Sequence, residues 1–409
     1  MRNMRLVPVS VLLLTALAAC GGTAPAASPA SSPAGASPAS SAAAKPATSG
    51  APAGSASAKP AGSAAAASGA TASLTLQQII DGAKKETAIK GSWSSDSFGG
   101  PDAFNAFVDG TNKKYGTNVK GTFTPGIDMQ SMQGKIAQEA AANQPPDSDI
   151  YLGNSQAMRD SLDTKTMSPY NWKALTDNSL PADGKQFDPY APENSGIAIA
   201  SAITGVTYNS KLVKPDVLPH KLQDLLNPAL KGKIASTPYA AGFRDFATKD
   251  MLGKQAMIDF VTKFSPQVAG LIRCGSNDQI SSGEFWMLAM DCGGTGIANA
   301  QATGAPVDQV VLDDITSVHS FYAAVPRNSQ APNFAALMAL YIDSPDGQAL
   351  LWKDWGGDMY TLPNAHTKAQ IDKVRAAAGK FAVDSPQWIS ENPDFPATQQ
   401  ELQKILAKK

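Results

Sequence analysis

The sequence predicts an α/β fold divided into two lobes. The segment from Ser73 to Lys409 has the mixed composition of a folded protein, and its roughly 340 residues exceed what one hydrophobic core usually holds. Its first part alternates helix-like and strand-like segments, an order typical of a mainly parallel sheet covered by helices. These observations predict two α/β lobes that follow a segment of different composition.

The elements of the first lobe follow from the spacing of apolar residues. Apolar residues at helical spacing predict helices, and short apolar runs predict strands. Pro101 suits the first turn of a helix. In chain order we expect a helix at 74–85, a strand at 89–93, a helix at 101–115, a strand at 119–124, a helix at 129–142 and a strand at 149–152.

Polar loops follow the first and third of these strands. Ligands of parallel sheets bind beyond the carboxyl ends of the strands, and helix N-termini there favour anions or polar oxygens. Each residue of these loops is also a common helix cap, so a capping role stays open beside ligand binding. The candidate binding residues are Ser94, Ser95 and Asp96 after the first strand, and Asn154 and Ser155 after the third.

The N-terminus has the features of an export signal. Arg2 and Arg5 precede an apolar run at 7–19 that is too short to span a bilayer. The run ends in Leu-Ala-Ala-Cys20, which resembles the lipobox of bacterial lipoproteins. The resemblance implies a signal peptide at 1–19 and a lipid on Cys20; an ordinary secretory signal is the alternative. Residues 20–72 are rich in Ala, Ser, Pro and Gly and predict a disordered tether.

Charge and cysteine content narrow the choice of partners. The net charge is −1, and Lys and Arg do not cluster with aromatic residues as a nucleic-acid surface requires. With Cys20 lipid-modified, export favours a disulfide between Cys274 and Cys292. Two free buried thiols are the alternative. Such a bridge stabilises by about 3 kcal/mol in the chain-entropy model.

The second lobe has a family-specific pattern. A strand ends in Tyr-Asn at 208–209, Leu-Pro follows at 218–219, and a helix end at 222–230 leads into Lys-Gly-Lys-Ile at 231–234. The motifs Gly-Ala-Pro-Val, Ala-Val-Pro-Arg and Ser-Pro-Asp-Gly-Gln-Ala-Leu follow in the same order. This pattern closely resembles that of bacterial extracellular solute-binding proteins, and the resemblance covers nearly all of 74–360.

The resemblance implies a type II periplasmic-binding-protein-like fold with a hinge between the lobes. It implies a receptor lipoprotein of an ABC importer, which captures a small polar or anionic solute between its lobes and delivers it to the membrane permease. We expect a monomer in the cell envelope whose partners are the solute, the permease subunits and the membrane, with no cofactor and no nucleic acid.

The expected lobe boundaries lie where the chain is expected to cross between the lobes. The first lobe is placed at 73–200 and 320–409 and the second at 201–319, with the hinge near 197–204 and 315–322. Helical segments at 367–381 and 398–406 are expected to pack across the first lobe.

The turn at 237–245 supplies the expected ligand contacts of the second lobe. It follows a strand at 233–236 and precedes a helix expected at 246–264, and in the resembled family such a turn opens a helix whose amides face the solute. Gly242 allows close backbone approach. Arg244 suits a carboxylate, sulfonate or phosphonate, although pairing with Asp245 remains an equal alternative. The expected ligand-binding residues are Tyr239, Gly242, Phe243, Arg244 and Asn299.

Two other functions are alternatives to the receptor of a small solute. Ferric-iron receptors of the same superfamily have a pair of adjacent tyrosines. The tyrosines of this sequence stand apart from one another, so no metal site is predicted. His319 is either a ligand or a packed histidine. A lipid-anchored enzyme on the same scaffold lacks support, because the sequence around Ser155 lacks the final Gly of a nucleophile elbow and HExxH is absent. The tyrosines in question are Tyr170, Tyr190, Tyr208, Tyr239 and Tyr322.

Overall fold

A computed structural model describes residues 71–184, 186–377 and 379–408 of the chain. The expected signal peptide, Cys20 and the tether as far as residue 70 lie outside the described residues. The expected tether extended to residue 72, but the structure already has a 3₁₀ turn at Thr71–Ser73. The Thr71 hydroxyl donates a hydrogen bond to the carbonyl of Pro169 at 2.8 Å, so the folded part begins slightly earlier than expected.

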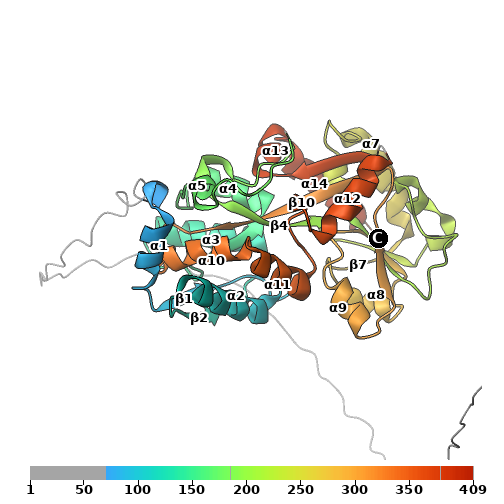
Figure 1. Ribbon diagram of the computed structural model, residues 1–409. Helices are drawn as coiled ribbons and strands as arrows, with labels where there is room; N and C mark the ends of the chain where they lie inside the picture. The colour runs from blue at the N-terminus through green and yellow to red at the C-terminus, as the bar shows by residue number, and fades with distance from the viewer. Residues whose placement is uncertain (1–70, 185, 378, 409) are drawn as a thin grey trace, which may run out of the picture. The chain divides into compact units, whose positions relative to one another are not determined.

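The first lobe contains strands at its centre and helices on both sides (Figure 1). Its strands are β1 (Ala88–Gly91), β2 (Lys120–Phe123), β3 (Tyr151–Asn154), β4 (Ile197–Ile203), β10 (Ile315–Ala324) and β11 (Lys380–Asp384). Its helices are α1 (Leu76–Ala83), α2 (Gly100–Tyr115), α3 (Met129–Ala141), α4 (Ser155–Thr164), α5 (Trp172–Leu175), α10 (Pro332–Ile342), α11 (Pro345–Trp355), α12 (His366–Ala376) and α13 (Pro386–Glu391). Pro192–Asn194 forms a 3₁₀ turn.

The strands of the first lobe are partly parallel, as expected, and partly antiparallel. β1 pairs with β2 in parallel, and Gly91 at the end of β1 forms a parallel bridge to Ile150, just before β3. The long strand β10 then pairs antiparallel with β3 and β4 and parallel with β11. The expected mainly parallel sheet is therefore confirmed for the first three strands, and the strands contributed later make the sheet mixed.

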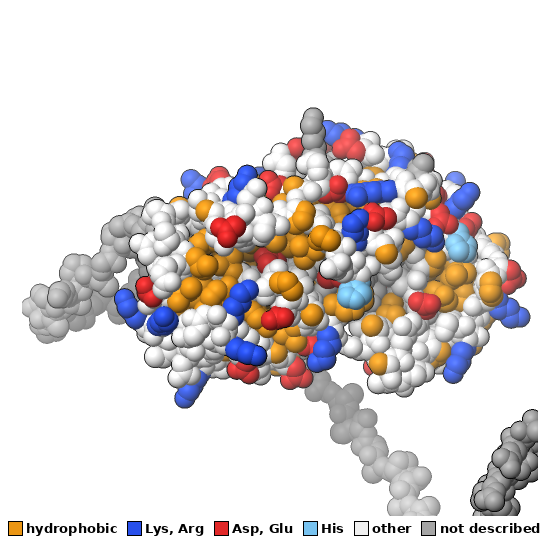
Figure 2. Space-filling model, viewed as in Figure 1, with side chains coloured by type: hydrophobic (Ala, Val, Ile, Leu, Met, Phe, Trp, Pro, Cys, Tyr) orange, Lys and Arg blue, Asp and Glu red, His pale blue; other side chains and the backbone are white. Residues whose placement is uncertain are grey.

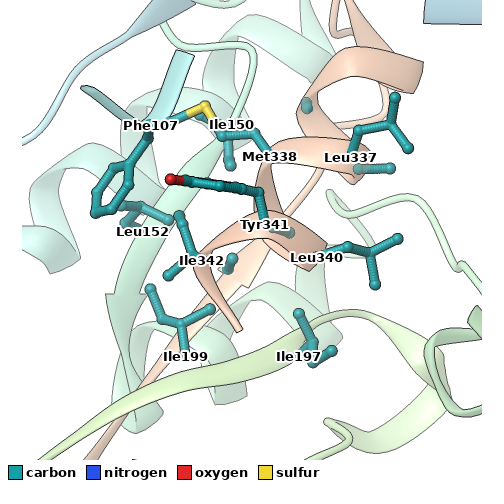
Figure 3. Packing of buried hydrophobic residues seen from close by; sticks show 14 of the residues in the cluster. Phe107, Ile150, Leu152, Ile197, Ile199, Leu337, Met338, Leu340, Tyr341 and Ile342 are labelled. Carbon is teal, nitrogen blue, oxygen red and sulfur yellow. The ribbon is translucent and has the colours of Figure 1, made fainter. Parts of the chain in front are cut away.

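The core of the first lobe is centred on α10. Every residue of this helix from Phe334 to Ile342 is buried, so the helix is apolar on all sides rather than amphipathic. Figure 3 shows Tyr341 and Ile342 of α10 close to Phe107 of α2 and Ile199 of β4. α10 thus lies between α2 and the sheet and fixes the position of the strands whose ends carry the candidate loops.

The second lobe is built on a separate five-stranded sheet with the strand order β7-β6-β8-β5-β9. Its strands are β5 (Gly205–Asn209), β6 (Ile234–Ser236), β7 (Val268–Leu271), β8 (Met287–Asp291) and β9 (Val307–Val310). Its helices are α6 (Phe243–Phe246), α7 (Lys254–Phe264), α8 (Asn277–Ser281) and α9 (Ile297–Ala302). The 3₁₀ turns Leu222–Leu226, Pro228–Leu230 and Ser265–Gln267 connect them.

The chain crosses between the two sheets at neighbouring points. β4 of the first sheet leads through Thr204 directly into β5 of the second, and β9 leads back into β10. β4 and β10 pair antiparallel with each other from Val318 and Ile203 to Ala323 and Ile197. Figure 1 shows both strands running between the helices of the two lobes. The two segments expected to form the hinge are therefore paired strands.

The C-terminal segment contacts both lobes. α13 packs on α4 of the first lobe, whereas the final helix α14 (Phe395–Leu406) packs on α6 and α7 of the second. Residues 398–406 were expected on the first lobe, so that expectation is wrong for this helix. The reason is its apolar face, since Leu402 and Leu406 are fully buried in the core of the second lobe.

Two expected helices have different limits in the structure. Of the helix expected at 246–264, residues 254–264 form α7, whereas α6 already ends at Phe246. Gly253 takes a φ of 86° immediately before α7 begins. The helix expected at 367–381 ends with α12 at Ala376, and Phe381 lies in β11. Among the helices of the described residues, none combines the length and apolar character needed to cross a bilayer.

The docking of α14 predicts a loss of stability when its buried face is reduced. Leu402 is fully buried, so Leu402→Ala should lower the free energy of unfolding by about 2–5 kcal/mol. Urea denaturation of the purified chain measures this change. Lys404→Ala, which alters an exposed residue of the same helix, is the control. Equal effects of the two substitutions would contradict the packing of α14 on the second lobe.

Candidate functional site

Three loops of the second lobe meet at one edge of its sheet. β6 pairs in parallel with both β7 and β8, so the carboxyl ends of these strands point to the same edge. The loops that follow contain residues 237–242, 272–276 and 292–296. In open α/β sheets ligands bind beyond such an edge, and this edge is the second-lobe half of the candidate site.

The three loops are joined to one another. A disulfide links Cys274, after β7, to Cys292, after β8. The hydroxyl of Tyr239, after β6, accepts a hydrogen bond of 2.7 Å from the backbone N–H of Cys274. Burial raises the pKa of Tyr239 above its usual value, so the phenol is neutral and can also donate. The second-lobe edge is therefore a connected unit rather than three independent loops.

The corresponding loops of the first lobe also lie at one edge. The parallel bridge between Gly91 and Ile150 directs the ends of β1 and β3 the same way. Ser95 and Asp96 are exposed, and Ser94 is half-buried. Asn154 accepts a 3.0 Å hydrogen bond from the backbone N–H of Ala157, so it caps α4. The structure therefore confirms the capping alternative for Asn154.

The two edges contact each other. Asp96 Oδ2 of the first lobe lies 3.6 Å from Arg273 Nε of the second, and both side chains are exposed. The backbone N–H of Gly296 donates a 3.1 Å hydrogen bond to the carbonyl of Trp355, at the end of α11. The loops at the carboxyl ends of both sheets therefore face one another, and we call this region the interlobe edge.

A hollow of about 450 Å³ lies beside the disulfide at this edge. The size is within the range of small-molecule sites. Asn277 donates a 2.9 Å hydrogen bond to the carbonyl of Thr295, which connects the loops on its two sides. The hollow is lined by Gly275, Ser276, Asn277, Asp278, Gln279, Gly296 and Ala300.

Several expected ligand-binding residues are enclosed instead. Ser155 and Phe243 are fully buried, Phe243 against the rings of Phe260 and Phe264. A side chain added at Gly242 would place its Cβ 2.7 Å from Thr204 Cγ2, so this glycine permits close approach to the crossing segment. Phe243 and Gly242 therefore serve packing in this arrangement, and the buried Ser155 hydroxyl contacts Asp384 and Ser320.

The other two expected residues of the second lobe also have defined surroundings. Arg244 Nε lies 3.3 Å from Asp245 Oδ1, and the side chain is only 11% exposed. The alternative of pairing with Asp245 is therefore the one found. Asn299 is exposed on α9, but Ala300 is the residue of that helix that lines the hollow.

Sequence reasoning missed Arg273, the exposed cation at the interlobe edge. Its position directly before Cys274, at the carboxyl end of a strand, is the signal that could have identified it. Trp355 and Gly296 were missed as well, because their contact is between backbone atoms and has no side-chain pattern.

A buried cluster of charged residues lies where the lobes join. His319 on β10 lies between two carboxylates, with Nδ1 at 3.0 Å from Asp384 Oδ2 and Nε2 at 3.6 Å from Asp245 Oδ2. Arg244 Nη2 lies 4.0 Å from Asp384 Oδ2. The two aspartates and the histidine are buried. We call these four residues the junction cluster.

The charges of the junction cluster shift the pKa values of His319 and Asp384. Burial alone would lower the pKa of His319, but the charges of Asp245 and Asp384 outweigh burial and raise the pKa above its usual value. Burial alone would raise the pKa of Asp384, but the hydrogen bond and charge of His319 outweigh it and the pKa is lowered. The surroundings of His319 therefore favour its protonated form next to two carboxylates.

The junction cluster is also the group of described residues that could be read as a metal site. The two ring nitrogens face different carboxylates, so one ion could not replace both contacts. Arg244 already supplies a positive charge at this position. The arrangement therefore fits an imidazolium rather than a metal ion.

The tyrosines considered for iron do not gather at one place. The Tyr170 hydroxyl donates to the carbonyl of Pro332, and the Tyr190 hydroxyl contacts that of Thr176. The Tyr208 hydroxyl faces Asp308 at 3.4 Å. These separate partners give no set of oxygen ligands of the kind that the iron alternative required.

Comparison with known proteins gives similarity at the level of structure. No family model matches the sequence, and none of the curated proteins matches it. The structure is similar to AgtB from A. tumefaciens R10, solved with agropinic acid, at 18% identity and a TM-score of 0.56, over 79% of this chain and 99% of AgtB.

Two further solved structures agree. An ABC transporter substrate-binding protein from Bradyrhizobium japonicum USDA 110 has 14% identity and a TM-score of 0.59, over 78% of this chain and 100% of that one. Trichodesmium IdiA (FutA), solved with iron and citrate, has 17% identity and a TM-score of 0.54, over 78% of this chain and 99% of that one. This chain therefore has the two-lobed α/β fold of periplasmic substrate-binding proteins.

The charges of the junction cluster predict how stability depends on pH. The raised pKa of His319 increases the free energy of unfolding. This contribution is complete below the pKa of the histidine in the unfolded chain, about 6.5, and is lost as pH rises through its pKa in the folded protein. The lowered pKa of Asp384 contributes stability above about 3.9, lost as pH falls through its folded value. His319→Gln should therefore destabilise the chain most near about pH 5.5 and least near about pH 9.

Urea denaturation of both forms across this range measures the difference. His220→Gln, at a half-exposed histidine, is the control and should show a smaller effect than His319→Gln near about pH 5.5. A destabilisation by His319→Gln that grows with pH would show that the imidazole is neutral in the folded protein.

Proposed function

We propose that this chain is the solute receptor of an ABC importer. The fold is that of substrate-binding proteins, and a fold alone leaves function open. The observation that carries the proposal is the interlobe edge, where loops at the carboxyl ends of both sheets face each other across the ion pair of Asp96 and Arg273. A solute held there would contact both lobes at once.

The connections between the lobes support capture by closure. Two chain connections between the lobes lie side by side on β4 and β10, so the lobes can rotate about these strands when the third connection, between α13 and α14, adjusts with them. A solute that contacts both lobes binds the closed arrangement better than the open one, and only this difference moves the equilibrium toward closure. The proposed hinge is thus at 197–204 and 315–322.

The side chains of the interlobe edge favour a small polar or anionic solute. The loops present hydroxyl and amide groups, with Asp96 and Arg273 as exposed charges. Arg244 is neutralised by Asp245 and Asp384, so Arg273 is the cation available to an anion. On the face drawn in Figure 2, positive and negative side chains are interspersed, unlike the basic surface of a nucleic-acid-binding protein.

The proposal includes a lipid anchor on Cys20 and a location at the cell envelope. The lipobox-like sequence before Cys20 and the low-complexity residues that follow support it. A receptor tethered to the membrane stays near its permease, which raises the effective concentration of the encounter.

A thermal-unfolding screen of the purified chain tests the receptor function. The panel is amino acids, phosphonates, sulfonates, polyamines, sugars, thiamine and ferric citrate. A true ligand at about one hundred times its dissociation constant should stabilise the fold by about 2.7 kcal/mol. Turnover of a panel compound, or no shift with any compound, would contradict the receptor proposal.

For an anionic ligand, Arg273→Gln should weaken binding by about tenfold to a hundredfold, because a hydrogen bond to a charged group contributes about 1.5–3 kcal/mol. Calorimetric titration measures the dissociation constant. Lys211→Gln, at an exposed residue, is the control and should leave affinity unchanged.

Arg244→Gln should instead lower stability. Loss of affinity with Arg244→Gln but not with Arg273→Gln would reverse the assignment.

The anchor is tested by Cys20→Ser. Because the thiol is the expected site of lipid attachment, the variant should move from the membrane fraction to the soluble fraction and lose incorporation of labelled palmitate. Cys274→Ser in the same cells is the control, because it removes a cysteine of the folded part and should leave labelling intact. Labelling that persists in Cys20→Ser would refute the anchor.

A further inference from the structure

The junction cluster links elements of both lobes through a continuous set of contacts. Arg244 and Asp245 belong to α6 of the second lobe, and His319 belongs to the shared strand β10. Asp384 ends β11. Ser155, the first residue of α4 in the first lobe, donates to Asp384 Oδ1 and to the carbonyls of Asp384 and Ser320, each at 3.0 Å. The cluster therefore joins the beginnings of α4 and α6.

The position of these helices relates the junction cluster to the interlobe edge. α4 begins at Ser155, directly at the end of β3, and α6 begins directly after the turn that follows β6. Both helix starts lie at the carboxyl-end edges described above. A change in the junction cluster therefore acts on one such edge in each lobe, although the cluster itself is enclosed.

All the contacts in the hydrogen-bonded set around His319 are filled when each ring nitrogen carries a proton. Nδ1 contacts Asp384 Oδ2 at 3.0 Å, and Nε2 contacts the Thr204 hydroxyl at 3.0 Å. Thr204 in turn contacts the Ser317 hydroxyl at 2.9 Å, and Ser317 donates to Asp245 Oδ2 at 2.7 Å. With an imidazolium, each of these contacts contains one proton.

A neutral imidazole would leave these four hydrogen-bond contacts one proton short. With Nδ1 protonated, Nε2 would accept the Thr204 proton, and Ser317 already gives its proton to Asp245. The contact between the Thr204 and Ser317 hydroxyls would then contain no proton. Charge balance agrees, because Arg244 and protonated His319 match two aspartates, and a neutral ring leaves a net negative charge. An unmatched buried charge is costly.

We propose that the junction cluster is a proton-dependent coupling between the lobes. While His319 is protonated, the cluster holds the beginnings of α4 and α6 in one arrangement. When His319 loses its proton, the contact through Thr204 and Ser317 weakens and α6 separates from β10 more easily. The inference goes beyond the receptor function and does not depend on the identity of the solute.

The other elements packed on β10 bring few competing charges. β3, β4 and α10 carry no Asp, Glu, Lys, Arg or His. Besides Asp384, β11 carries Lys380, which pairs with Ile315 at the start of β10 and whose ammonium donates to the carbonyl of Met251. On α4, Arg159 pairs with Asp163 and Asp160 accepts from Gln156. Burial raises the pKa values of the neighbouring phenols well above their usual value, so they stay neutral; these are Tyr151 on β3 and Tyr322 on β10. The charges that face His319 are therefore those of the junction cluster.

Histidine NMR on the purified chain is the first part of the test. The chain has three histidines, and His220→Gln and His366→Gln assign the other two signals. His319 should titrate above the free value of about 6.5. Titration of His319 at or below that value would overturn the proposal without any change to the cluster.

Hydrogen exchange is the second part. Exchange at the beginnings of α4 and α6, corrected for its intrinsic pH dependence, should accelerate together as pH rises through the His319 titration. The expected gain is up to about tenfold for each pH unit by which the titration lies above about 6.5. Acceleration in α6 alone, or in neither helix, would overturn the coupling. Failure of the solute screen would leave this result unaffected.

Two serines of α4 provide a matched pair of variants. Ser155→Ala removes the contact to Asp384 and should accelerate exchange in α6 of the other lobe. Ser161→Ala removes a buried hydroxyl that donates to Met158 within α4 and should leave α6 unchanged. Equal effects of the two variants on α6 would show that destabilisation of α4, rather than the junction cluster, is responsible.

Discussion

The pairing of β4 with β10 is the constraint on which the rest of the structure depends. These two strands carry the chain between two separate sheets and pair with each other residue by residue. Both strands are buried along their whole length, and Ser317 and His319 of β10 contact the two carboxylates of the junction cluster. The ion pair of Asp96 and Arg273, by contrast, is exposed and contributes little stability. The lobes are thus held firmly at the crossing and weakly at the interlobe edge.

This difference fits a receptor that opens and closes. A strong connection at the crossing keeps the two sheets in register, while a weak contact at the edge can be replaced by contacts to a solute. The C-terminal segment follows the same division, because α13 packs on the first lobe and α14 on the second. The closure must therefore be accommodated in the short link between these helices as well as at the crossings.

Much of the fold could be predicted from the sequence. The order of helices and strands in the first lobe follows from local apolar spacing, and helix limits such as that of α2 follow from Gly and Pro. The assignment of α14 could not be predicted, because its amphipathic pattern is compatible with either lobe. The break between α6, which ends at Phe246, and α7, which begins at Lys254, does not show in the pattern of apolar residues.

The candidate site was harder to predict than the fold. The loops were located correctly by the ends of strands, but the roles within them depend on burial. Ser155 and Arg244 are polar residues in the right loops, yet contacts from distant segments, above all Asp384, enclose both. Such contacts connect residues more than a hundred positions apart and leave no local signal. At the interlobe edge, Asp96 was predicted from its position after a strand, whereas Arg273 was missed although it directly precedes Cys274 at the end of a strand.

The distance between the lobes tests the central claim most directly. Spin labels at cysteines replacing Lys113 and Lys231, exposed residues of the two lobes, would be measured by pulsed dipolar spectroscopy in a chain carrying Cys20→Ser. Labels replacing Lys113 and Lys173 report on the first lobe alone. The account predicts that the pooled solutes of the screen shorten the distance between the lobes and leave the distance within the first lobe unchanged. An interlobe distance that the pooled solutes do not alter would contradict capture by closure about β4 and β10.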